Sequence, residues 1–406
     1  MLKQKKLTGF SSTAIHSGSN IDPNQSHLIP IYASSTYVFD SAEQGMRRFN
    51  GDEKGYIYSR WGNPTITEVE ETISALESFG IEENNEALQL KTLLHASGMA
   101  ALTTLMLGNL KTGDKILSHF SLYGGTQELM EKVLPEVGIE AIIVDLRDLD
   151  KPEEALKNDS KIKMLYLETP ANPTIQCVDI EALCKLGKQH NLIVAVDNTF
   201  ATPYLQQPFK YNVDYVFHST TKFLNGHGTA IGGALTGKDI EHMETRMTKV
   251  HRLLGGNSNS FDAFLLSQGM KTLEVRMERH CQNAVIVAKF LNEHPAVGKV
   301  NYLGLASHPD YATSQKQMKH PGAMMSFDMK GGLSDGINFI NKLQMCVRAV
   351  SLGTCDTLLS HPASMTHYGV PKEKREEYGI TDGLIRMSVG IENVEDIVND
   401  LDQALS

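Results

Sequence analysis

Short apolar runs alternate with helical patterns through the middle of this chain. The runs lie at residues 93–97, 115–118, 141–144, 164–167, 192–196 and 215–217. Residues 65–79 and 98–107 instead carry apolar side chains at helical spacing. Runs this short that alternate with helices are typical of βαβ units, in which helices cover both faces of a parallel sheet. The pattern therefore predicts an α/β fold.

The pattern changes at both ends of the chain. Residues 11–25 are polar and rich in turn formers, residues 29–39 read as a short extended stretch, and neither could form a core alone. This segment is either packed on another surface or a simple lead-in. A small-residue loop at 255–260 precedes helical spacing at 277–293 and a mixed tail that ends in a predicted helix at 394–405. We therefore expect a second, smaller domain, on which the mixed charges of 372–377 form a solvated face.

Composition narrows the class of protein. A length of 406 residues suits two or three domains, and 41% hydrophobic with 21% charged residues excludes a disordered chain. The net charge of −10 argues against nucleic acid or an anionic membrane as the main partner. No window approaches the ~18 apolar residues of a membrane span. A local basic pocket is still compatible with this net charge.

Localisation is predicted from the start of the chain and from its cysteines. Residues 1–6 contain lysines with no apolar stretch after them, so no secretory signal is expected. The cysteines are scattered, odd in number and without a C-x-x-C pair, which indicates neither a disulfide framework nor a zinc ribbon. We expect a cytoplasmic protein with reduced thiols. The cysteines are Cys177, Cys184, Cys281, Cys346 and Cys355.

The residues that follow the apolar runs carry the candidate chemistry, because ligands of open parallel sheets bind beyond the carboxyl ends of the strands. Gly98 and Met99 open a helix, where free N–H groups attract an anion. Tyr123 could stack on a flat ligand, although such a tyrosine alone is more often core. Asp197 ends an apolar strand, where a carboxylate needs a cationic partner.

Lys222 completes this set. It follows Ser219 and Thr221, whose hydroxyls could hold a phosphate together with the helix start at Gly98. An activated lysine amine can form a Schiff base. A Schiff-base lysine, an acid for a pyridinium nitrogen and a phosphate cup are the requirements of pyridoxal 5′-phosphate. The sequence therefore predicts this cofactor.

The chain resembles the Cys/Met-metabolism (trans-sulfuration) family of fold-type I pyridoxal-phosphate enzymes, most nearly methionine gamma-lyases and cystathionine gamma-lyases. The resemblance implies a mostly parallel seven-stranded sheet with flanking helices. It divides the chain into an N-terminal arm at 1–62 that contacts a neighbouring subunit, a cofactor-binding domain at 63–260 and a smaller α/β domain at 261–406. The matching stretches are residues 56–65, 97–100, 122–126, 168–174, 196–199, 218–222 and 383–390.

The resemblance also implies a role for each candidate residue. Lys222 would carry the cofactor and move protons, Asp197 would partner its ring nitrogen, and Tyr123 would stack on the ring and act on substrate protons. Arg386, assisted by Ser351, would bind the substrate carboxylate in a bidentate fork, with Asn172 near the cofactor or that carboxylate. The phosphate would be held by Gly98, Met99, Ser219 and Thr221, and from the neighbouring subunit by Tyr58 and Arg60. The family thereby implies a homotetramer, a dimer of active dimers.

The predicted reaction is γ-elimination on a sulfur-containing amino acid, methionine or cystathionine, giving a 2-oxo acid, ammonia and a thiol. Residues 361–367 and the tail through Gly390 look most like bacterial methionine gamma-lyases. Those lyases usually carry Cys where this chain has Gly125 and Asp where it has Thr229. γ-Replacement on an O-acyl-homoserine, as in a cystathionine gamma-synthase or an O-acetylhomoserine sulfhydrylase, is the alternative.

Other classes of function fit less well. Ser219-x-x-Lys222 and the Lys-Thr-Gly at 111–113 also suit a serine–lysine acyl-enzyme, but they occur in reversed order and without Ser-Asp-Asn. Metal-ligand spacing is absent, so no metal is predicted and the histidines are expected to be hydrogen-bonded structural groups. A non-catalytic relative is disfavoured because Lys222, Asp197, Tyr123 and Arg386 are all present. The histidines concerned are His218, His227, His361 and His367.

Overall fold

The computed structural model describes residues 7–18, 22 and 24–406. The lysine-containing start at 1–6, on which the expectation about a secretory signal depends, lies outside the described residues. The chain falls into two compact units, each described here by itself. The first comprises the described residues up to Asn109 with Phe217–Thr221 and Thr229–Thr272, and the second comprises Leu110–Val216, Lys222–Gly228 and Leu273–Ser406.

Seven strands form the large sheet, in the order β3-β9-β8-β7-β6-β4-β5. Within the second unit, β4 pairs in parallel with β5 and β6, and β6 pairs in parallel with β7. Within the first unit, β9 pairs antiparallel with β3, so the sheet is mixed rather than purely parallel. The predicted seven-stranded, mostly parallel sheet is confirmed. The strands are β3 (Lys91–His95), β4 (Lys115–His119), β5 (Glu140–Val144), β6 (Ile162–Glu168), β7 (Ile193–Asp197), β8 (Tyr215–His218) and β9 (Gly233–Gly237).

Helix α3 (Pro64–Glu77) shows why the first unit folds locally as it does. The Asn63 side chain caps it by accepting from Thr65 N, and Pro64 at the first position has the fixed φ that a helix start needs. Val69, Ile73 and Leu76 are buried on one face, at the predicted helical spacing. The other elements of the first unit are α1 (Phe10–His16), α2 (Ala42–Asn50), β1 (Glu82–Glu83), β2 (Glu86–Ala87), α4 (Gly98–Asn109), α9 (Ile240–His242), η4 (Met243–Met247), α10 (Thr248–Leu254) and α11 (Ser260–Met270).

The N-terminal part of the first unit contains two helices that were not predicted. Helix α1 occupies part of the stretch expected to be turn-rich, and it buries Phe10, Thr13 and Ala14. Helix α2 buries only Gly45, and its large apolar side chains, Met46 and Phe49, are exposed rather than packed in a core. The Ser41 side chain caps α2 by accepting from Gln44 N. Arg47, within the helix, forms an ion pair at 2.8 Å with Glu53, which follows the helix. Local polar contacts, rather than core burial, therefore specify α2.

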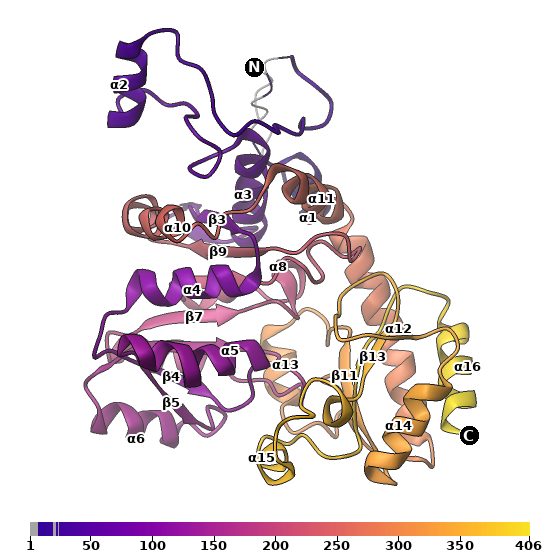
Figure 1. The fold of residues 1–406 in the computed structure, drawn as a ribbon. Helices are drawn as coiled ribbons and strands as arrows, with labels where there is room; N and C mark the ends of the chain where they lie inside the picture. Colours follow the sequence, from indigo (N-terminus) through magenta and orange to yellow (C-terminus); the bar gives the residue numbers. More distant parts are fainter. Residues whose placement is uncertain (1–6, 19–21, 23) are drawn as a thin grey trace. The chain divides into compact units, whose positions relative to one another are not determined.

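Helices of the second unit lie beside its strands of the large sheet (Figure 1). Helix α7 begins after Asp179, whose carboxylate accepts from Ala182 N, and it buries Ile180, Leu183 and Cys184. These helices are α5 (Gly124–Glu128), η1 (Leu129–Val133), η2 (Leu134–Val137), α6 (Asp150–Asn158), α7 (Ile180–Gln189), α8 (Thr202–Leu205), η3 (Pro208–Tyr211) and α13 (Tyr311–Gln317).

A smaller sheet of five strands, in the order β10-β11-β14-β13-β12, belongs to the same unit. Helix α16 (Val394–Leu405) contacts both α12 (Leu273–Glu293) and α14 (Gly332–Lys342) beside this sheet (Figure 1). The predicted helix at 394–405 is confirmed, and the one expected from 277 starts one turn earlier. The strands are β10 (Val297–Asn301), β11 (Met324–Met329), β12 (Val347–Arg348), β13 (Leu358–Ser360) and β14 (Leu384–Ser388).

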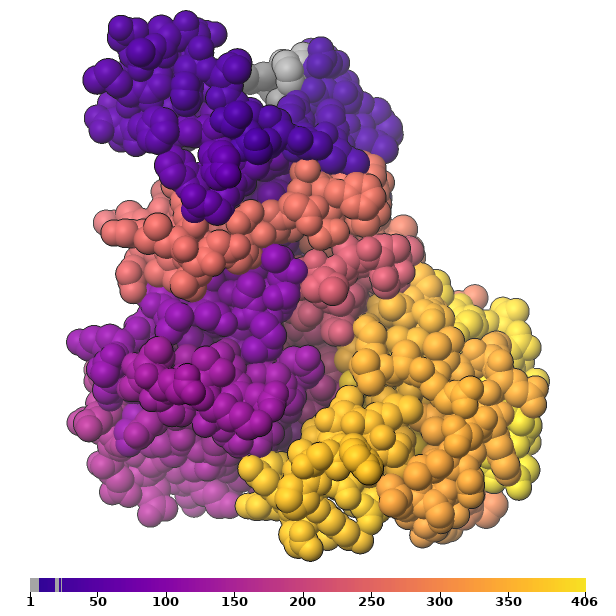
Figure 2. Space-filling view, in the orientation of Figure 1, coloured from indigo at the N-terminus to yellow at the C-terminus, as the bar shows by residue number. Residues whose placement is uncertain are grey.

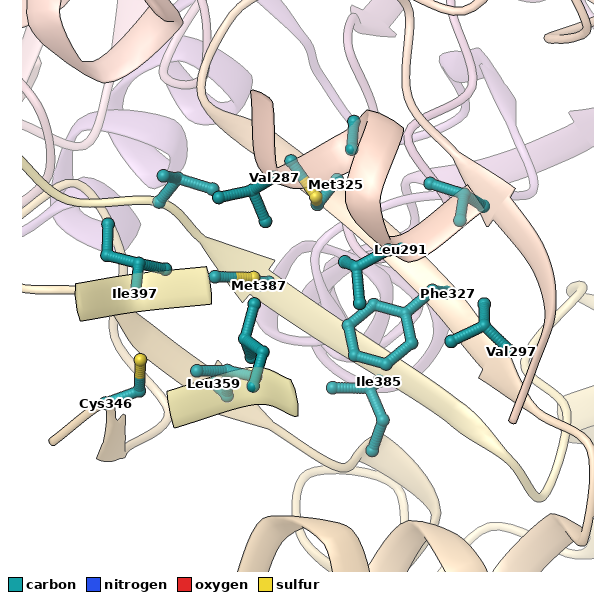
Figure 3. Packing of buried hydrophobic residues seen from close by; sticks show 14 of the residues in the cluster. Val287, Leu291, Val297, Met325, Phe327, Cys346, Leu359, Ile385, Met387 and Ile397 are labelled. Carbon is teal, nitrogen blue, oxygen red and sulfur yellow. The ribbon is translucent and has the colours of Figure 1, made fainter. Parts of the chain in front are cut away.

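The core of this smaller sheet orients strand β14. Ile385 and Met387 point into a buried cluster with Phe327 of β11, Val287 of α12 and Ile397 of α16 (Figure 3). Successive side chains of a strand point to opposite faces. Arg386, between Ile385 and Met387, therefore lies on the face of the sheet opposite this core.

The charged run at 372–377 forms helix α15 (Lys372–Glu377), at the lower edge of the space-filling view (Figure 2). The prediction of a solvated face is wrong for one residue, because Arg375 is buried and its guanidinium pairs with Asp382 at 2.7 Å. The other five side chains of α15 are exposed. A short 3-10 turn, η5 (Pro362–Ser364), precedes this helix.

Two further expectations concern the state of the cysteines and the presence of membrane-spanning helices. All five cysteines are free, and only Cys355 is more than slightly exposed. In the described part of the chain, no helix combines the length and the apolar character needed to cross a membrane.

Candidate active site

Lys222, the predicted reactive group, belongs to the second unit. It comes four residues after the end of β8, it is half-buried, and its Nζ donates to the Ser351 hydroxyl at 3.2 Å. Burial, and next the positive charge of Arg386, lower the pKa of the Lys222 amine from 10.5 to about 8. A substantial fraction of the amine is then neutral near physiological pH, as a nucleophile or proton carrier requires.

The Arg386 side chain extends from β14 toward polar groups of the same unit. Its Nη2 donates to the carbonyls of Val350 at 2.9 Å and Ser351 at 2.8 Å, and its Nη1 donates to Asn172 Oδ1 at 3.2 Å. The side chain is only 5% exposed, and within the described residues its buried Nε has no hydrogen-bond partner. A buried guanidinium with an unused donor is costly, and a carboxylate would satisfy it. Burial lowers the pKa of Arg386 to about 10.

Asp197 ends β7 as a buried carboxylate. Its Oδ1 accepts from Thr199 N at 2.9 Å, and its Oδ2 accepts from the Tyr166 hydroxyl at 3.4 Å. Tyr123 stands at the start of α5, with its side chain half exposed and its backbone N–H donating to Glu168 Oε2 at 2.8 Å. An acid for a ring nitrogen and an accessible aromatic for a ring face are thus both present in the second unit.

The four residues predicted to hold a phosphate, Gly98, Met99, Ser219 and Thr221, belong to the first unit. A Cβ on Gly98 would lie 3.1 Å from Ser219 Cβ and 3.3 Å from Phe217 Cζ, so a side chain at this helix start would be crowded. Ser97 Oγ caps α4 by accepting from Ala100 N at 3.1 Å, with Met99 in the first turn. The Thr221 hydroxyl accepts from Gly232 N at 3.0 Å and donates to Gly232 O at 3.3 Å. A helix start crowded by hydroxyls is suited to a phosphate.

Tyr58 and Arg60 lie together in the segment before α3. The Tyr58 backbone forms an antiparallel bridge with Thr36, and the Arg60 guanidinium lies 5.6 Å from the centre of the Tyr58 ring. Arg60 also donates to the carbonyl of Arg252, near the end of α10. These contacts hold both side chains as a pair within the first unit.

The histidines considered as metal ligands are instead engaged in hydrogen bonds. His218 Nε2 lies 2.5 Å from Glu77 Oε1, and His227 Nδ1 lies 2.7 Å from Asn225 O. His361 contacts Ser364 and the Asp382 carbonyl, and His367 contacts Thr366. Nowhere in the described ranges do three or more His, Cys, Asp or Glu side chains gather as a metal site would require.

Two carboxylates of these units were given no role from the sequence. Glu77, in α3, forms the fully buried contact with His218, and Glu168 accepts the Tyr123 amide. A sequence signal existed for Glu168, because it ends an apolar strand in the same way as Asp197. No signal pointed to Glu77, because its partner is 141 residues away.

The first unit, taken by itself, contains a helix start that is suited to a phosphate. The second unit contains an amine, an acid, an aromatic ring and a buried guanidinium, and these residues fit pyridoxal phosphate. This set belongs to the class of pyridoxal-phosphate-dependent amino-acid enzymes. Residues 11–406 match the family model described as Cys/Met metabolism PLP-dependent enzyme. The chain belongs to this family, as predicted, and its cofactor is pyridoxal phosphate.

Known relatives cover almost the whole chain. An L-methionine gamma-lyase from Fusobacterium nucleatum subsp. nucleatum is 46% identical over 99% of both chains. A solved cystathionine gamma-lyase from Lactobacillus plantarum, complexed with L-serine, is 35% identical over 98% of both chains with a TM-score of 0.88. A cystathionine gamma synthase from Xanthomonas oryzae pv. oryzae is 34% identical, covers 98% of this chain and 97% of its own, and has a TM-score of 0.89.

Proposed function

We propose that this chain is a carbon–sulfur lyase that carries out γ-elimination on methionine or cystathionine, giving a 2-oxo acid, ammonia and a thiol. One observation carries the proposal: relatives that share 40–47% of their residues over 98% or more of this chain are named L-methionine gamma-lyases.

Substrate binding is assigned to Arg386. The hydrogen bonds of Arg386 to Asn172 and to the carbonyls of residues 350 and 351 use both N–H groups of Nη2 and one N–H of Nη1. They leave the Nε–H and the other N–H of Nη1 for the α-carboxylate of an amino acid. Because these contacts hold the guanidinium before substrate arrives, little side-chain entropy is lost on binding. Arg386 thereby orients the α-carbon toward Lys222.

Proton transfer is assigned to Lys222. Bound pyridoxal phosphate supplies an electron sink that stabilises negative charge at the substrate α-carbon. Lys222, with its pKa near 8, takes the proton from that carbon and returns protons to neighbouring carbons, and Ser351 orients its amine. Asp197 would hold the proton on the ring nitrogen of bound pyridoxal phosphate, and the Tyr123 ring would stack on the cofactor ring.

We further propose an assembly in which Tyr58 and Arg60 hold the phosphate of a neighbouring subunit. Support comes from the segment that carries them, where Val38, Met46 and Phe49 are 90%, 72% and 61% exposed, because exposed apolar side chains of this size mark association surfaces. The assembly is a homotetramer of active dimers, and its five free thiols suit the cytoplasm. The arm at 1–62, the cofactor domain at 63–260 and the C-terminal domain at 261–406 remain the proposed functional division.

γ-Replacement on an O-acyl-homoserine is the second candidate, favoured by the likeness to the solved cystathionine gamma synthase. A substrate panel separates the two reactions. Methionine, cystathionine, cysteine, O-acetylhomoserine and O-succinylhomoserine are each incubated with the holoenzyme, with and without a thiol. Release of 2-oxobutanoate from methionine or cystathionine without a thiol supports the lyase, and a thioether formed only with a thiol supports replacement.

A further inference from the structure

Glu168 is a buried carboxyl group between two loops of the proposed site. It ends β6, is 4% exposed, and pairs in register with Asp197 of β7. Its Oε2 accepts from the backbone N–H of Tyr123 at 2.8 Å, and its Oε1 accepts from the backbone N–H of Asn172 at 3.0 Å. The Glu168 side chain therefore joins the loop that carries the Tyr123 ring to the loop that carries the Asn172 side chain.

The second of these loops leads directly to the substrate arginine. Asn172 Oδ1 accepts from Arg386 Nη1 at 3.2 Å. A continuous set of hydrogen bonds thus runs from Tyr123 through Glu168 and Asn172 to Arg386. A shift of Glu168 would move the ring-covering residue and the carboxylate-binding residue relative to each other.

Glu168 occupies this place at an electrostatic cost. Burial, and next the neighbouring charge of Asp197, raise the pKa of Glu168 well above its usual range. A glutamine of the same size would avoid the repulsion, but its side chain has only one oxygen, whereas two N–H groups point at Glu168. Two acceptors on one rigid group are what this position requires.

We infer that Glu168 is a positioning residue that fixes the separation between Tyr123 and the Asn172–Arg386 pair. The inference deepens the proposed function and rests on it for the identity of the substrate. It assigns Glu168 no contact with substrate or cofactor. Its effect passes through two backbone amides, so its removal should disturb both the ring environment and carboxylate binding.

The test compares Glu168→Gln and Glu168→Asp with a matched control. Gln keeps the size but faces one of the two amides with an NH₂ group, and Asp keeps the charge but is one methylene too short to reach both. Asp400→Asn is the control, because Asp400 is 6% exposed and also accepts from backbone amides, those of Gln344, Met345 and Cys346. Asp400 lies on α16, away from the residues proposed to hold substrate.

Three quantities are measured on each holoenzyme: the visible circular dichroism of bound cofactor, kcat and KM for the best substrate of the panel, and the thermal midpoint. For Glu168→Gln we expect an altered dichroism band, a raised KM and a kcat/KM lower by about 10- to 100-fold, with a thermal midpoint no lower than that of the control. Glu168→Asp should behave similarly. Asp400→Asn should lower the midpoint with unchanged dichroism and a kcat/KM within about twofold of the wild type.

Each other outcome is decisive. Unchanged dichroism and kcat/KM in a folded Glu168→Gln or Glu168→Asp enzyme would overturn the inference. A lower kcat/KM in Glu168→Gln that comes only with a thermal midpoint below that of the control, and with unchanged dichroism, would reduce Glu168 to a structural role and overturn the inference as well. If the wild type releases no 2-oxo acid from the panel while Glu168→Gln still alters the dichroism, the proposed reaction fails and the positioning role stands.

Discussion

The amine of Lys222 and the hydroxyl of Ser351 are hydrogen-bonded at 3.2 Å. The same serine accepts from Arg386 Nη2 through its backbone carbonyl at 2.8 Å. Ser351 therefore contacts both the group proposed to move protons and the group proposed to bind the substrate carboxylate. The two contacts use different atoms of Ser351, so substitution can separate them.

Ser351→Ala should lower kcat more than it raises KM. The substitution removes the hydroxyl that orients the Lys222 amine and keeps the carbonyl that holds Arg386. Loss of one such hydrogen bond predicts a kcat lower by about 2- to 12-fold. Steady-state kinetics on the panel substrate provide the measurement, and Ser351→Thr, which keeps a hydroxyl, is the control. A raised KM with unchanged kcat would assign the hydroxyl to substrate binding instead.

The reaction of cofactor-free protein with added pyridoxal phosphate should depend on pH through Lys222. Only the neutral amine attacks an aldehyde, and the pKa of Lys222 is lowered to about 8. The rate of appearance of the visible band should rise about tenfold per pH unit below pH 8 and level off above it. In Arg386→Met the second cause of the lowered pKa is absent, so the profile should move to higher pH. A wild-type profile that still rises at pH 10 would contradict this assignment.

Arg386→Ala should raise KM far more than it weakens cofactor binding. The guanidinium is proposed to make charge-assisted hydrogen bonds to the substrate carboxylate, and losing two of them predicts a KM higher by about 100-fold or more. Arg386→Lys keeps a charge without the fork and should recover only part of the loss. Cofactor content is measured on the same preparations by absorbance. An equal loss of cofactor in Arg386→Ala would point to a phosphate role.

The Glu77–His218 contact should contribute strongly to stability. Both side chains are 0% exposed and their atoms meet at 2.5 Å, so Glu77→Ala leaves a buried polar partner without compensation. Breaking a buried pair costs about 3–5 kcal/mol, which urea unfolding should detect as a clearly lower midpoint. Glu128→Gln is the control, because Glu128 and its partner Lys132 are both 67% exposed and should contribute nothing measurable. A Glu77→Ala midpoint equal to that of the control would refute the prediction.

Two inactive variants should restore activity when their subunits mix. If Arg60 holds the phosphate of a neighbouring subunit, Arg60→Ala and Lys222→Ala chains co-expressed together form some sites that have both groups. Activity of the purified mixture is compared with that of each variant alone. A chain carrying both substitutions, mixed with Lys222→Ala, should restore none. A fully active monomer in light scattering would contradict the intersubunit role.

The sequence predicted the elements that are specified by apolar periodicity. Helix α16 has the expected limits, and α3 starts at Pro64, one residue before the expected start, where Asn63 provides the cap. Strand β9 was not foreseen, because its Gly-Ala-Leu-Thr-Gly sequence has few apolar side chains even though every residue is buried. Its burial depends on tertiary contacts with β3, which local pattern does not encode.

The candidate site was predicted to a similar degree and for similar reasons. Residues in continuous motifs, such as Lys222 and Asp197, followed from their positions after apolar strands and from the family resemblance. The contact between Asn172 and Arg386 joins residues 214 positions apart, so no spacing could reveal it. Glu168 begins the matching stretch 168–174, but the sequence suggested no role for it, because its proposed role depends on where two backbone amides point.

The most direct test of this account is the release of 2-oxobutanoate from L-methionine by purified holoenzyme with no added thiol. The account predicts steady release by the wild-type enzyme, and none above background by Lys222→Ala, which should also lose the yellow colour of the wild type. Release by Lys222→Ala at the wild-type rate, or no release by a fully cofactor-loaded wild type, would contradict the account.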